Sequence, residues 1–319
     1  MHKITARVAK TLIVGIIVSL TSGVLTPAVQ AAPKNQARAV VQADWLEKNL
    51  TNPDVKIIEV STEAGLYERG HIKNAIKFNW YTDFVDPVNR DIVNRANLQK
   101  LAQKAGINSD SIIVLYGDKN NWFAAWGAWV FNIYGAKDVR ILDGGRVKWG
   151  KDGRPFTTEV ATPKAGSFSA AAADNTLRAF LIRDVLPVAK KRSKVSLVDI
   201  RSADEYNGKV FAASGFQELA IRAGHIPGAQ NIPWGLNVNP DGTFKTVEEL
   251  KKLYADKGID GSKPIITYCR IGERAALTWF VLSEILGYDV KNYDGSWTEY
   301  GNTVGLPIVN NAGTIWGAS

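Results

Sequence analysis

The strongest constraint on the fold of this chain is an internal repeat, because segments of its first half return in the same order in its second half. The offset between matched residues stays between 151 and 154 over about eighty residues. The matched segments are 70–75 with 224–229, 98–107 with 250–259, 112–116 with 264–268, and 142–145 with 293–296. A nearly constant offset of this kind indicates a duplicated unit and predicts two domains of one fold.

Each copy alternates short, apolar, β-branched runs with helical patterns. The predicted buried strands are 55–60, 112–116, 195–200 and 264–268, and the clearest predicted helices are 96–105 and 246–257. Strands and helices that alternate in this way indicate an α/β fold in which a parallel sheet is covered by helices on both faces. Ligands of such sheets bind beyond the carboxyl ends of the strands.

The two copies predict a domain division. We expect a first domain at residues 36–158, a linker at 159–176 and a second domain at 177–312. The stretch from about residue 156 to 175 is rich in Thr, Pro, Ser and Ala. We expect this connection to pack little and to turn easily.

The N-terminus has the three parts of a secretory signal. A basic start without acidic residues precedes an apolar run at 11–20, and the small residues Val29 and Ala31 precede the expected cleavage site. The alternative is a retained membrane anchor, which needs ~20 uninterrupted apolar residues, whereas Gly15 and Ser19 interrupt this run. We therefore expect residues 1–31 to be a signal peptide and the mature protein to be periplasmic or secreted, without stable membrane association.

The composition describes a folded protein that acts on small molecules. Hydrophobic residues make up 45% of the chain and charged residues 22%, which is typical of globular proteins. Loss of residues 1–31 leaves 288 residues and lowers the formal net charge from +8 to +5. That charge suits a small anionic substrate but is too low to predict nucleic-acid binding.

The chain has a single cysteine, Cys269, so no internal disulfide can form. A lone cysteine is often only a small buried apolar residue, but this one lies between the predicted strand 264–268 and an apolar helix that begins near Ala275. In such a loop, inward N–H groups, the helix dipole and the two arginines of segment 269–274 favour a thiolate. We expect Cys269 to be a nucleophile whose pKa lies one or more units below about 8.5.

The loop 269–274 resembles the active-site loop of the rhodaneses, the thiosulfate sulfurtransferases. The segments 224–229 and 293–297 resemble two further signatures of that family, and the resemblance extends from about Val40 to Pro307. It implies two tandem rhodanese-like domains, of which the first is catalytically empty. Gly117 occupies in the first copy the position that Cys269 occupies in the second.

The resemblance implies a transfer in two steps. Cys269 attacks the outer sulfur of thiosulfate, sulfite leaves as a stable anion without a general acid, and a persulfide passes its sulfur to cyanide or a thiol. Arg270 and Arg274 supply the positive charge that the dianion needs. The residues expected to bind the donor are Arg270, Ile271, Gly272, Glu273 and Arg274. The expected partners are a small anionic donor and a nucleophilic acceptor, which could be a protein.

Four further residues enter through the same resemblance. Asp199 and Arg201 end a predicted strand, and in relatives an acid here fastens the active loop while a nearby arginine binds substrate. Many relatives have an arginine where this chain has Glu205, which leaves the role of Arg201 open. Trp122 and Phe123 match aromatic residues that the first domain of relatives presents to the active cleft, although core packing explains them equally well.

Histidines occupy the same position in both copies, at His71 and His225. Because the first copy has no nucleophile, we interpret His225 as structural support that ties a turn to neighbouring backbone. No cluster of His, Asp or Glu accompanies Cys269, so we expect neither a metal nor another cofactor.

The sequence bears on three alternative functions. Cysteine-dependent phosphatases place five residues between Cys and Arg, whereas four separate Cys269 from Arg274. Enzymes that use 3-mercaptopyruvate usually have Gly directly after the Cys, so Arg270 favours thiosulfate. A carrier or sensor of sulfane sulfur that turns over poorly remains open, as does the 3-mercaptopyruvate reading.

Overall fold

The computed structural model describes residues 36–317 except 216 and 218. The expected signal peptide, residues 1–31, lies outside the described residues. Within the part of the chain that is described, no helix is long and apolar enough to cross a membrane.

Two five-stranded sheets of the same topology form the framework. The strands of the first sheet are β1 (Val40–Val41), β2 (Val55–Glu59), β3 (Ile76–Lys77), β4 (Ile112–Tyr116) and β5 (Asp138–Leu142). Those of the second are β6 (Arg178–Ala179), β7 (Ser196–Asp199), β8 (Ala229–Asn231), β9 (Ile265–Tyr268) and β10 (Val290–Tyr293). Their orders are β1-β5-β4-β2-β3 and β6-β10-β9-β7-β8, and all the pairings are parallel. The equivalent orders confirm the predicted duplication and the α/β fold.

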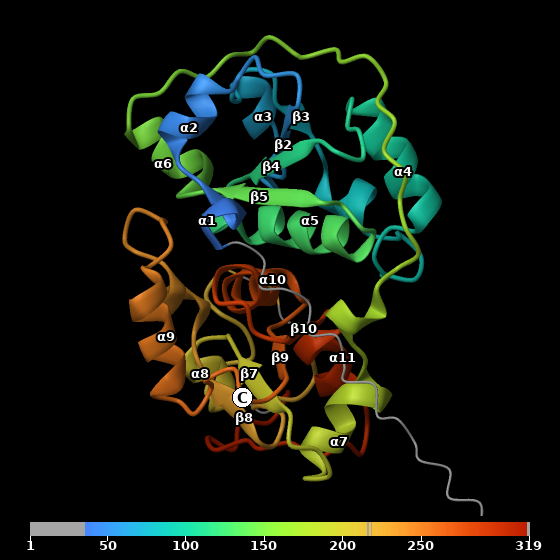
Figure 1. Cartoon of the computed structure of the whole chain (residues 1–319). Helices are drawn as coiled ribbons and strands as arrows, with labels where there is room; N and C mark the ends of the chain where they lie inside the picture. The colour runs from blue at the N-terminus through green and yellow to red at the C-terminus, as the bar shows by residue number, and fades with distance from the viewer. Residues whose placement is uncertain (1–35, 216, 218, 318–319) are drawn as a thin grey trace, which may run out of the picture. The chain divides into compact units, whose positions relative to one another are not determined.

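Helices connect the strands in both halves (Figure 1). The helices of the first half are α1 (Gln36–Ala39), α2 (Ala43–Lys48), α3 (Leu66–Arg69), α4 (Arg95–Lys104), α5 (Trp122–Ile133) and α6 (Gly145–Lys151). Those of the second half are α7 (Leu186–Ala189), α8 (Ala203–Tyr206), α9 (Val247–Ala255), α10 (Glu273–Phe280) and α11 (Ser296–Asn302). The predicted helices 96–105 and 246–257 are α4 and α9. The second begins where Thr246 and Glu249 form a capping box.

The buried side chains of the first sheet alternate between its two faces. Ile57 and Val114 pack in a cluster that includes residues of α2, α3 and α6. Ile58 and Ile113, which are adjacent to Ile57 and Val114 in the same strands, pack in a cluster that includes residues of α4 and α5. This alternation follows from the two-residue period of a strand and requires helices on both faces.

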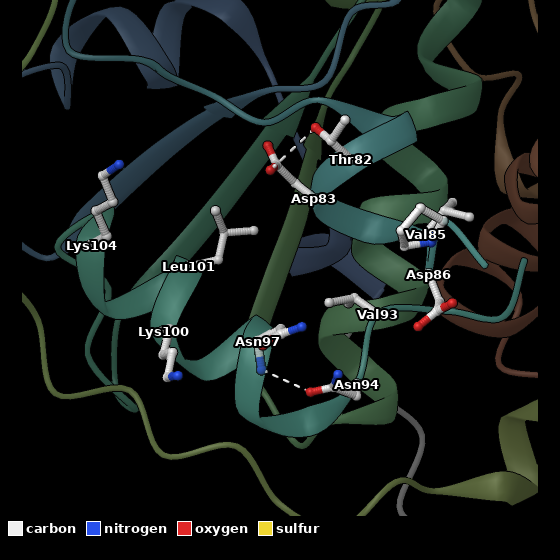
Figure 2. A pocket seen from close by; sticks show the side chains of 11 residues that line it. Thr82, Asp83, Val85, Asp86, Val93, Asn94, Asn97, Lys100, Leu101 and Lys104 are labelled. Carbon is white, nitrogen blue, oxygen red and sulfur yellow. Dashed lines mark hydrogen bonds between the residues drawn. The ribbon is translucent and has the colours of Figure 1, made fainter. Parts of the chain in front are cut away.

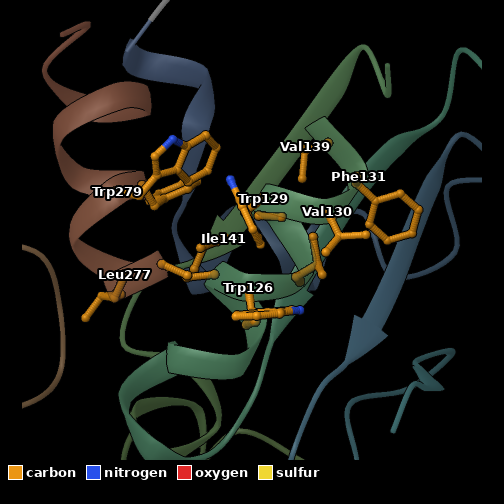
Figure 3. Close-up of a cluster of buried hydrophobic side chains, with 14 of the residues drawn as sticks. Trp126, Trp129, Val130, Phe131, Val139, Ile141, Leu277 and Trp279 are labelled. Atoms are coloured by element: carbon orange, nitrogen blue, oxygen red, sulfur yellow. The ribbon is translucent and has the colours of Figure 1, made fainter. Parts of the chain in front are cut away.

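One hydrophobic core joins the two halves. α5 and α10 follow the equivalent strands β4 and β9, and they pack against each other between the sheets (Figure 1). Trp126 and Trp129 of α5 and Leu277 and Trp279 of α10 are fully buried in this core (Figure 3). Because large aromatic side chains bury much apolar surface, this contact fixes the first domain against the helix that carries the cysteine loop.

The connection between the domains differs from the prediction. Phe168 and Ala170 are almost completely buried, and the Phe168 ring packs edge-on against Phe131. The backbone of the segment pairs with the first domain, as in the bond from Phe168 N–H to the carbonyl of Ile107 at 3.0 Å. The expectation of a loosely packed linker is therefore wrong, because Phe168 and Ala170 anchor this polar segment in the core.

The position equivalent to Cys269 in the first domain has no room for a side chain. A Cβ atom on Gly117 would lie 2.3 Å from the carbonyl oxygen of Val60. The Gly117 N–H donates to Asn121 Oδ1 at 3.0 Å, which closes the turn. A cysteine at this position would displace backbone, so the first domain lacks both the nucleophile and the space for it.

Candidate active site

The loop 269–272 connects β9 to α10, both of which are buried. All four residues of β9 are buried, and Cys269 follows directly at the carboxyl end of the strand. Gly272 precedes α10 with a φ of 91°, in the left-handed region. A Cβ at Gly272 would lie 2.8 Å from both Asp294 Oδ1 and Trp126 Cζ3. This turn therefore requires glycine for its backbone conformation and for its close contacts.

The Cys269 sulfur is fully buried, and its closest described polar contacts come from Gly272 and Glu273. The N–H of Gly272 donates to Sγ at 3.1 Å, and Sγ lies 3.4 Å from Oε2 of Glu273. The backbone of Cys269 is held by α11, because its N–H donates to Ser296 Oγ at 3.1 Å and its carbonyl accepts from Trp297 N–H at 3.0 Å. The loop thus directs an N–H group and a carboxylate at one sulfur atom.

The pKa of the Cys269 thiol is raised to about 12, mainly by burial and then by the charge of Glu273. Arg274 and the backbone N–H groups of Ala275 and Ile271 act in the opposite direction but are outweighed. The predicted lowering of this pKa is wrong. The donors that favour a thiolate are present, but complete desolvation and a carboxylate in the loop disfavour the charged form more strongly.

The two arginines of the loop have different partners. Arg270 is partly exposed and donates through Nη1 to the carbonyl of Gln217 at 2.6 Å. Arg274 is buried and forms a two-fold ion pair with Glu205, with N–O distances of 3.1 and 3.2 Å. Burial alone would raise the pKa of Glu205, but Arg274 and Arg201 outweigh it, so the pKa is lowered. Glu205 therefore serves as the partner of Arg274, which explains why this chain tolerates an acid there.

Asp199 and Arg201 form a second buried ion pair behind the loop. Arg201 Nη2 lies 2.6 Å from Asp199 Oδ2 and also donates to the carbonyl of Gly224 at 2.7 Å. Its guanidinium stacks over the ring of Trp297 at 4.7 Å. Burial and Asp199 raise the pKa of Tyr268, the residue before Cys269, well above its ordinary value. Asp199 thus binds Arg201 and interacts with Tyr268, the residue before the loop. Arg201 itself lies in the core, with 1% of its surface exposed.

The aromatic residues predicted to face the cleft lie in the core. The Trp122 ring packs edge-on against Trp234, with ring centres 4.7 Å apart, and Phe123 packs against Trp80 at 5.2 Å. Of the aromatic residues of α5, it is Trp126, one helical turn beyond Trp122, that borders the loop at Gly272. Trp122 and Phe123 thus have the core packing that the sequence left open, and Trp126, four residues after Trp122 on the same face of α5, is the ring that lies against Gly272.

His225 has the contacts of a structural residue. Its ring stacks on Tyr206 with centres 3.6 Å apart, and its Nδ1 lies 2.7 Å from the Tyr206 carbonyl. Burial lowers its pKa. His71 makes the same stacking contact with Tyr67 at 3.7 Å in the first domain, so the shared position has a shared packing role.

Sequence reasoning missed Arg90, Ser296 and Trp126. Arg90 belongs to the first domain and donates to the carbonyl of Ile271 in the cysteine loop at 2.5 Å. It also lines a cavity of about 770 Å³ beside Ile271 and Asp294. The repeat places Ser296 near the loop, but no sequence signal links Arg90 to a loop some 180 positions away.

Other pockets lie apart from the cysteine loop. One of about 310 Å³ lies between residues 82–87 and α4, with Asp83, Asn94, Lys100 and Lys104 among its lining side chains (Figure 2). None of its lining residues belongs to the loop or contacts it in the hydrogen bonds and ion pairs described here. Among the described residues, no three His, Cys, Asp or Glu side chains gather into a group that could hold a metal ion.

The chain belongs to the rhodanese family. The rhodanese-like domain matches twice, at residues 42–152 and 186–303. A Mycobacterium tuberculosis protein named "Putative thiosulfate sulfurtransferase" is 50% identical over 84% of this chain and 96% of its own length. The sulfur carrier protein TtuD of Thermus thermophilus is also 50% identical, over 84% of this chain and 95% of its own length.

Solved structures show the same fold. The crystal structure of SseA from Escherichia coli, described as a 3-mercaptopyruvate sulfotransferase, has a TM-score of 0.69 and 28% identity over 81% of this chain and 98% of its own. The anaerobic ergothioneine biosynthesis enzyme of Chlorobium limicola has a TM-score of 0.75 and 25% identity, over 87% of this chain and 71% of its own.

The raised pKa of Cys269 gives a first prediction. Replacing Glu273 by Gln removes a negative charge 3.4 Å from the sulfur, so the thiol pKa should fall. The measurement is the pH dependence of Cys269 alkylation by iodoacetamide. Wild type should show a rate that rises with pH without a plateau up to about pH 10, whereas Glu273→Gln should reach its plateau at lower pH. The shape of the profile is compared, since burial slows both proteins.

Glu248→Gln is the control for this experiment, because Glu248 is exposed in the first turn of α9 and its loss changes the net charge equally. A Glu273→Gln profile that coincides with wild type would show that the carboxylate does not set the thiol pKa.

Proposed function

We propose that this chain is a thiosulfate sulfurtransferase that carries the transferred sulfur as a persulfide on Cys269. The observation that carries the proposal is the position of Cys269, the single cysteine of the chain, in a strand-to-helix loop whose Gly272 N–H is directed at the sulfur. Relatives named as thiosulfate sulfurtransferases at about 50% identity over most of the chain support it.

The first step must ionise a thiol that resists ionisation. Loss of the Cys269 proton while Glu273 is charged places two negative charges 3.4 Å apart. Transfer of the proton from Sγ to the Glu273 carboxylate avoids this repulsion and leaves a single negative charge on the sulfur. In this proposal Glu273 is thus a proton acceptor within the donor-binding loop.

The sulfur transfer then follows in two displacements. The Cys269 thiolate attacks the outer sulfur of thiosulfate, a new S–S bond forms, and the old S–S bond breaks with its electron pair leaving on sulfite. The Gly272 N–H stabilises negative charge on the cysteine sulfur. Cyanide or a thiolate next attacks the outer sulfur of the persulfide, which returns Cys269 as a thiolate that recovers its proton.

Two other functions are supported by particular relatives. SseA is described as a 3-mercaptopyruvate sulfotransferase, and TtuD is named a sulfur carrier protein. Steady-state turnover separates these readings from the proposed one. A thiosulfate sulfurtransferase turns over thiosulfate with cyanide, a 3-mercaptopyruvate enzyme prefers that donor, and a carrier or sensor forms the persulfide but turns over poorly.

We also propose that residues 1–31 are removed and that the mature protein is periplasmic or secreted. The support is the sequence pattern alone, a basic start, a short apolar run and small residues at Val29 and Ala31.

Cys269→Ser should abolish sulfur transfer and leave the fold intact, since the hydroxyl cannot form a persulfide. The measurements are turnover of thiosulfate with cyanide, and intact mass after incubation with thiosulfate, in which wild type should gain one sulfur atom. Circular dichroism checks the fold. Residual turnover of about a tenth of wild type would contradict the assignment, because loss of a nucleophile costs far more.

Arg270→Gly should lower kcat/KM for thiosulfate by about ten- to a hundredfold, the size of one hydrogen bond to a charged group. The loss with 3-mercaptopyruvate should be smaller, because that donor carries one carboxylate and can use the released space. Both donors are measured on both proteins, with Arg270→Lys as the control that keeps the charge. Equal losses would mean that Arg270 supports the loop through its bond to Gln217 and does not select the donor.

N-terminal sequencing of the protein isolated from its native cells tests the export proposal. The expected first residue lies at or near Ala32, in a fraction outside the cytoplasm. A soluble cytoplasmic product that begins at Met1 would refute export, and recovery of the uncleaved chain with membranes would favour the anchor.

A further inference from the structure

The catalytically empty first domain places an arginine on the cysteine loop of the second domain. Arg90 Nη2 donates to the carbonyl oxygen of Ile271 at 2.5 Å. The other arm, Nη1, lies 3.0 Å from both carboxylate oxygens of Asp294. One guanidinium thus joins the loop that follows β9 to the segment that follows β10.

The carbonyl of Ile271 and the N–H of Gly272 belong to the same peptide group. A peptide group is planar and trans, so its carbonyl and its N–H point in opposite directions. Here the carbonyl points to Arg90, and the N–H donates to Cys269 Sγ at 3.1 Å. Any rotation of this peptide plane that releases Arg90 also turns the N–H away from the sulfur.

The first domain holds the Arg90 side chain in place. Its guanidinium lies 5.5 Å from the ring centre of Trp80 and 5.3 Å from that of Trp126, and the two rings contact each other edge to face. The Arg90 backbone has a φ of 58°, a left-handed conformation that is unfavourable in a residue other than glycine. Its N–H donates to the Asp86 carbonyl at 3.0 Å, which closes the turn that aims the side chain.

Asp294 completes the arrangement on the second domain. Its side chain is mostly buried, and a Cβ on Gly272 would meet its Oδ1 at 2.8 Å, so it lies directly against the loop. Arg90 therefore pairs with the acid that borders Gly272 and at the same time bonds to the carbonyl that precedes it.

We propose that Arg90 is a positioning residue for sulfur transfer, which fixes the Ile271–Gly272 peptide so that its N–H points at the Cys269 sulfur. The proposal rests on the proposed role of Cys269 as the sulfur carrier. It gives the first domain, which has no nucleophile, a direct part in the active site of the second.

Arg90→Met tests the proposal, because methionine keeps apolar packing against the two tryptophans and removes both hydrogen-bonding arms. The matched control is Arg178→Met. Arg178 of the second domain pairs with Asp91 of the first, so this ion pair also crosses between the domains. Arg178 lines the same cavity as Arg90 and Ile271, but its ion pair is to Asp91 and not to the loop, so the control keeps the location and omits the bond to Ile271. Arg90→Lys is the second variant; it keeps the charge toward Asp294 but has no second planar arm for Ile271.

Two readouts are measured on each protein, with thermal stability as a check on folding. The single-turnover rate of persulfide formation from thiosulfate should fall by about ten- to a hundredfold in Arg90→Met, the size of one hydrogen bond to a charged group. The alkylation rate of Cys269 at fixed pH should also fall, because loss of the N–H donor raises the thiol pKa further. Arg90→Lys should lose nearly as much, and Arg178→Met should stay within about twofold of wild type in both readouts.

Equal losses in Arg90→Met and Arg178→Met would overturn the proposal, since both would then act through domain contact. Unchanged alkylation in both Arg90 variants would also overturn it. If wild type forms no persulfide with thiosulfate, the proposed function fails, and the alkylation comparison still decides the role of Arg90.

Discussion

Burial of the Cys269 sulfur is the constraint to which the rest of the site responds. The sulfur has no exposed surface, and the carboxylate of Glu273 lies 3.4 Å from it. A low-dielectric site disfavours the thiolate, but it also strengthens every interaction made with that thiolate once it forms. The Gly272 N–H therefore acts at short range on an unscreened charge. Stabilisation of the thiolate in this loop therefore depends more on the accurate orientation of a few N–H groups than on the number of charges nearby.

The two duplicated domains share a framework of strands and buried charges, but only the second has a cysteine in its loop. Each domain has a buried tyrosine at the end of its fourth strand, next to a buried acid that is paired with an arginine. In the first domain Glu59 pairs with Arg146 and accepts from Tyr116. In the second domain, Asp199 pairs with Arg201. The two arginines come from different places in the repeat, because Arg201 follows the end of β7, the second strand of its sheet in chain order, whereas Arg146 follows β5, the fifth. The charge cluster behind the loop is thus shared, although its arginine comes from different parts of the repeat.

What differs is the residue after the tyrosine. Gly117 brings the backbone of the first domain within a distance of Val60 that excludes any side chain. Cys269 instead has its backbone held by Ser296 and Trp297, which leaves its side chain directed into the loop. The first copy has therefore not merely lost a nucleophile. Its loop has closed over the position, and it ends in three consecutive residues, from Lys119 to Asn121, with left-handed backbone angles.

The sequence predicted those features that depend on local pattern or on the repeat. Strand and helix positions followed from periodicity, and the two copies supported each other, as β4 and β9 show. The loop around Cys269 was recognisable because strand, cysteine and helix are contiguous. The packed connection was not, since two residues, Phe168 and Ala170, decide it. The thiol pKa was predicted with the wrong sign because residue types indicate which charges are near but not how completely the sulfur is desolvated.

Contacts between distant segments were beyond sequence reasoning. Arg274 was expected to meet the donor, and the structure gives it Glu205 as a partner, a residue noted only as a departure from the family. Arg90 carried no signal at all. Its importance arises from three-dimensional packing, because α5 lies against α10 and brings Trp126 to Gly272.

This packing offers a physical reason for the presence of an empty domain. A peptide group in a short loop can rotate unless both of its polar atoms have partners, and the partner of the Ile271 carbonyl lies on the other domain. The second domain alone would leave that carbonyl to water and would lose the packing of α10 against α5 of the first domain. The same interface thus contributes apolar burial and one directed hydrogen bond, from Arg90 to the Ile271 carbonyl. This hydrogen bond connects the packing of the two domains to the chemistry of the sulfur.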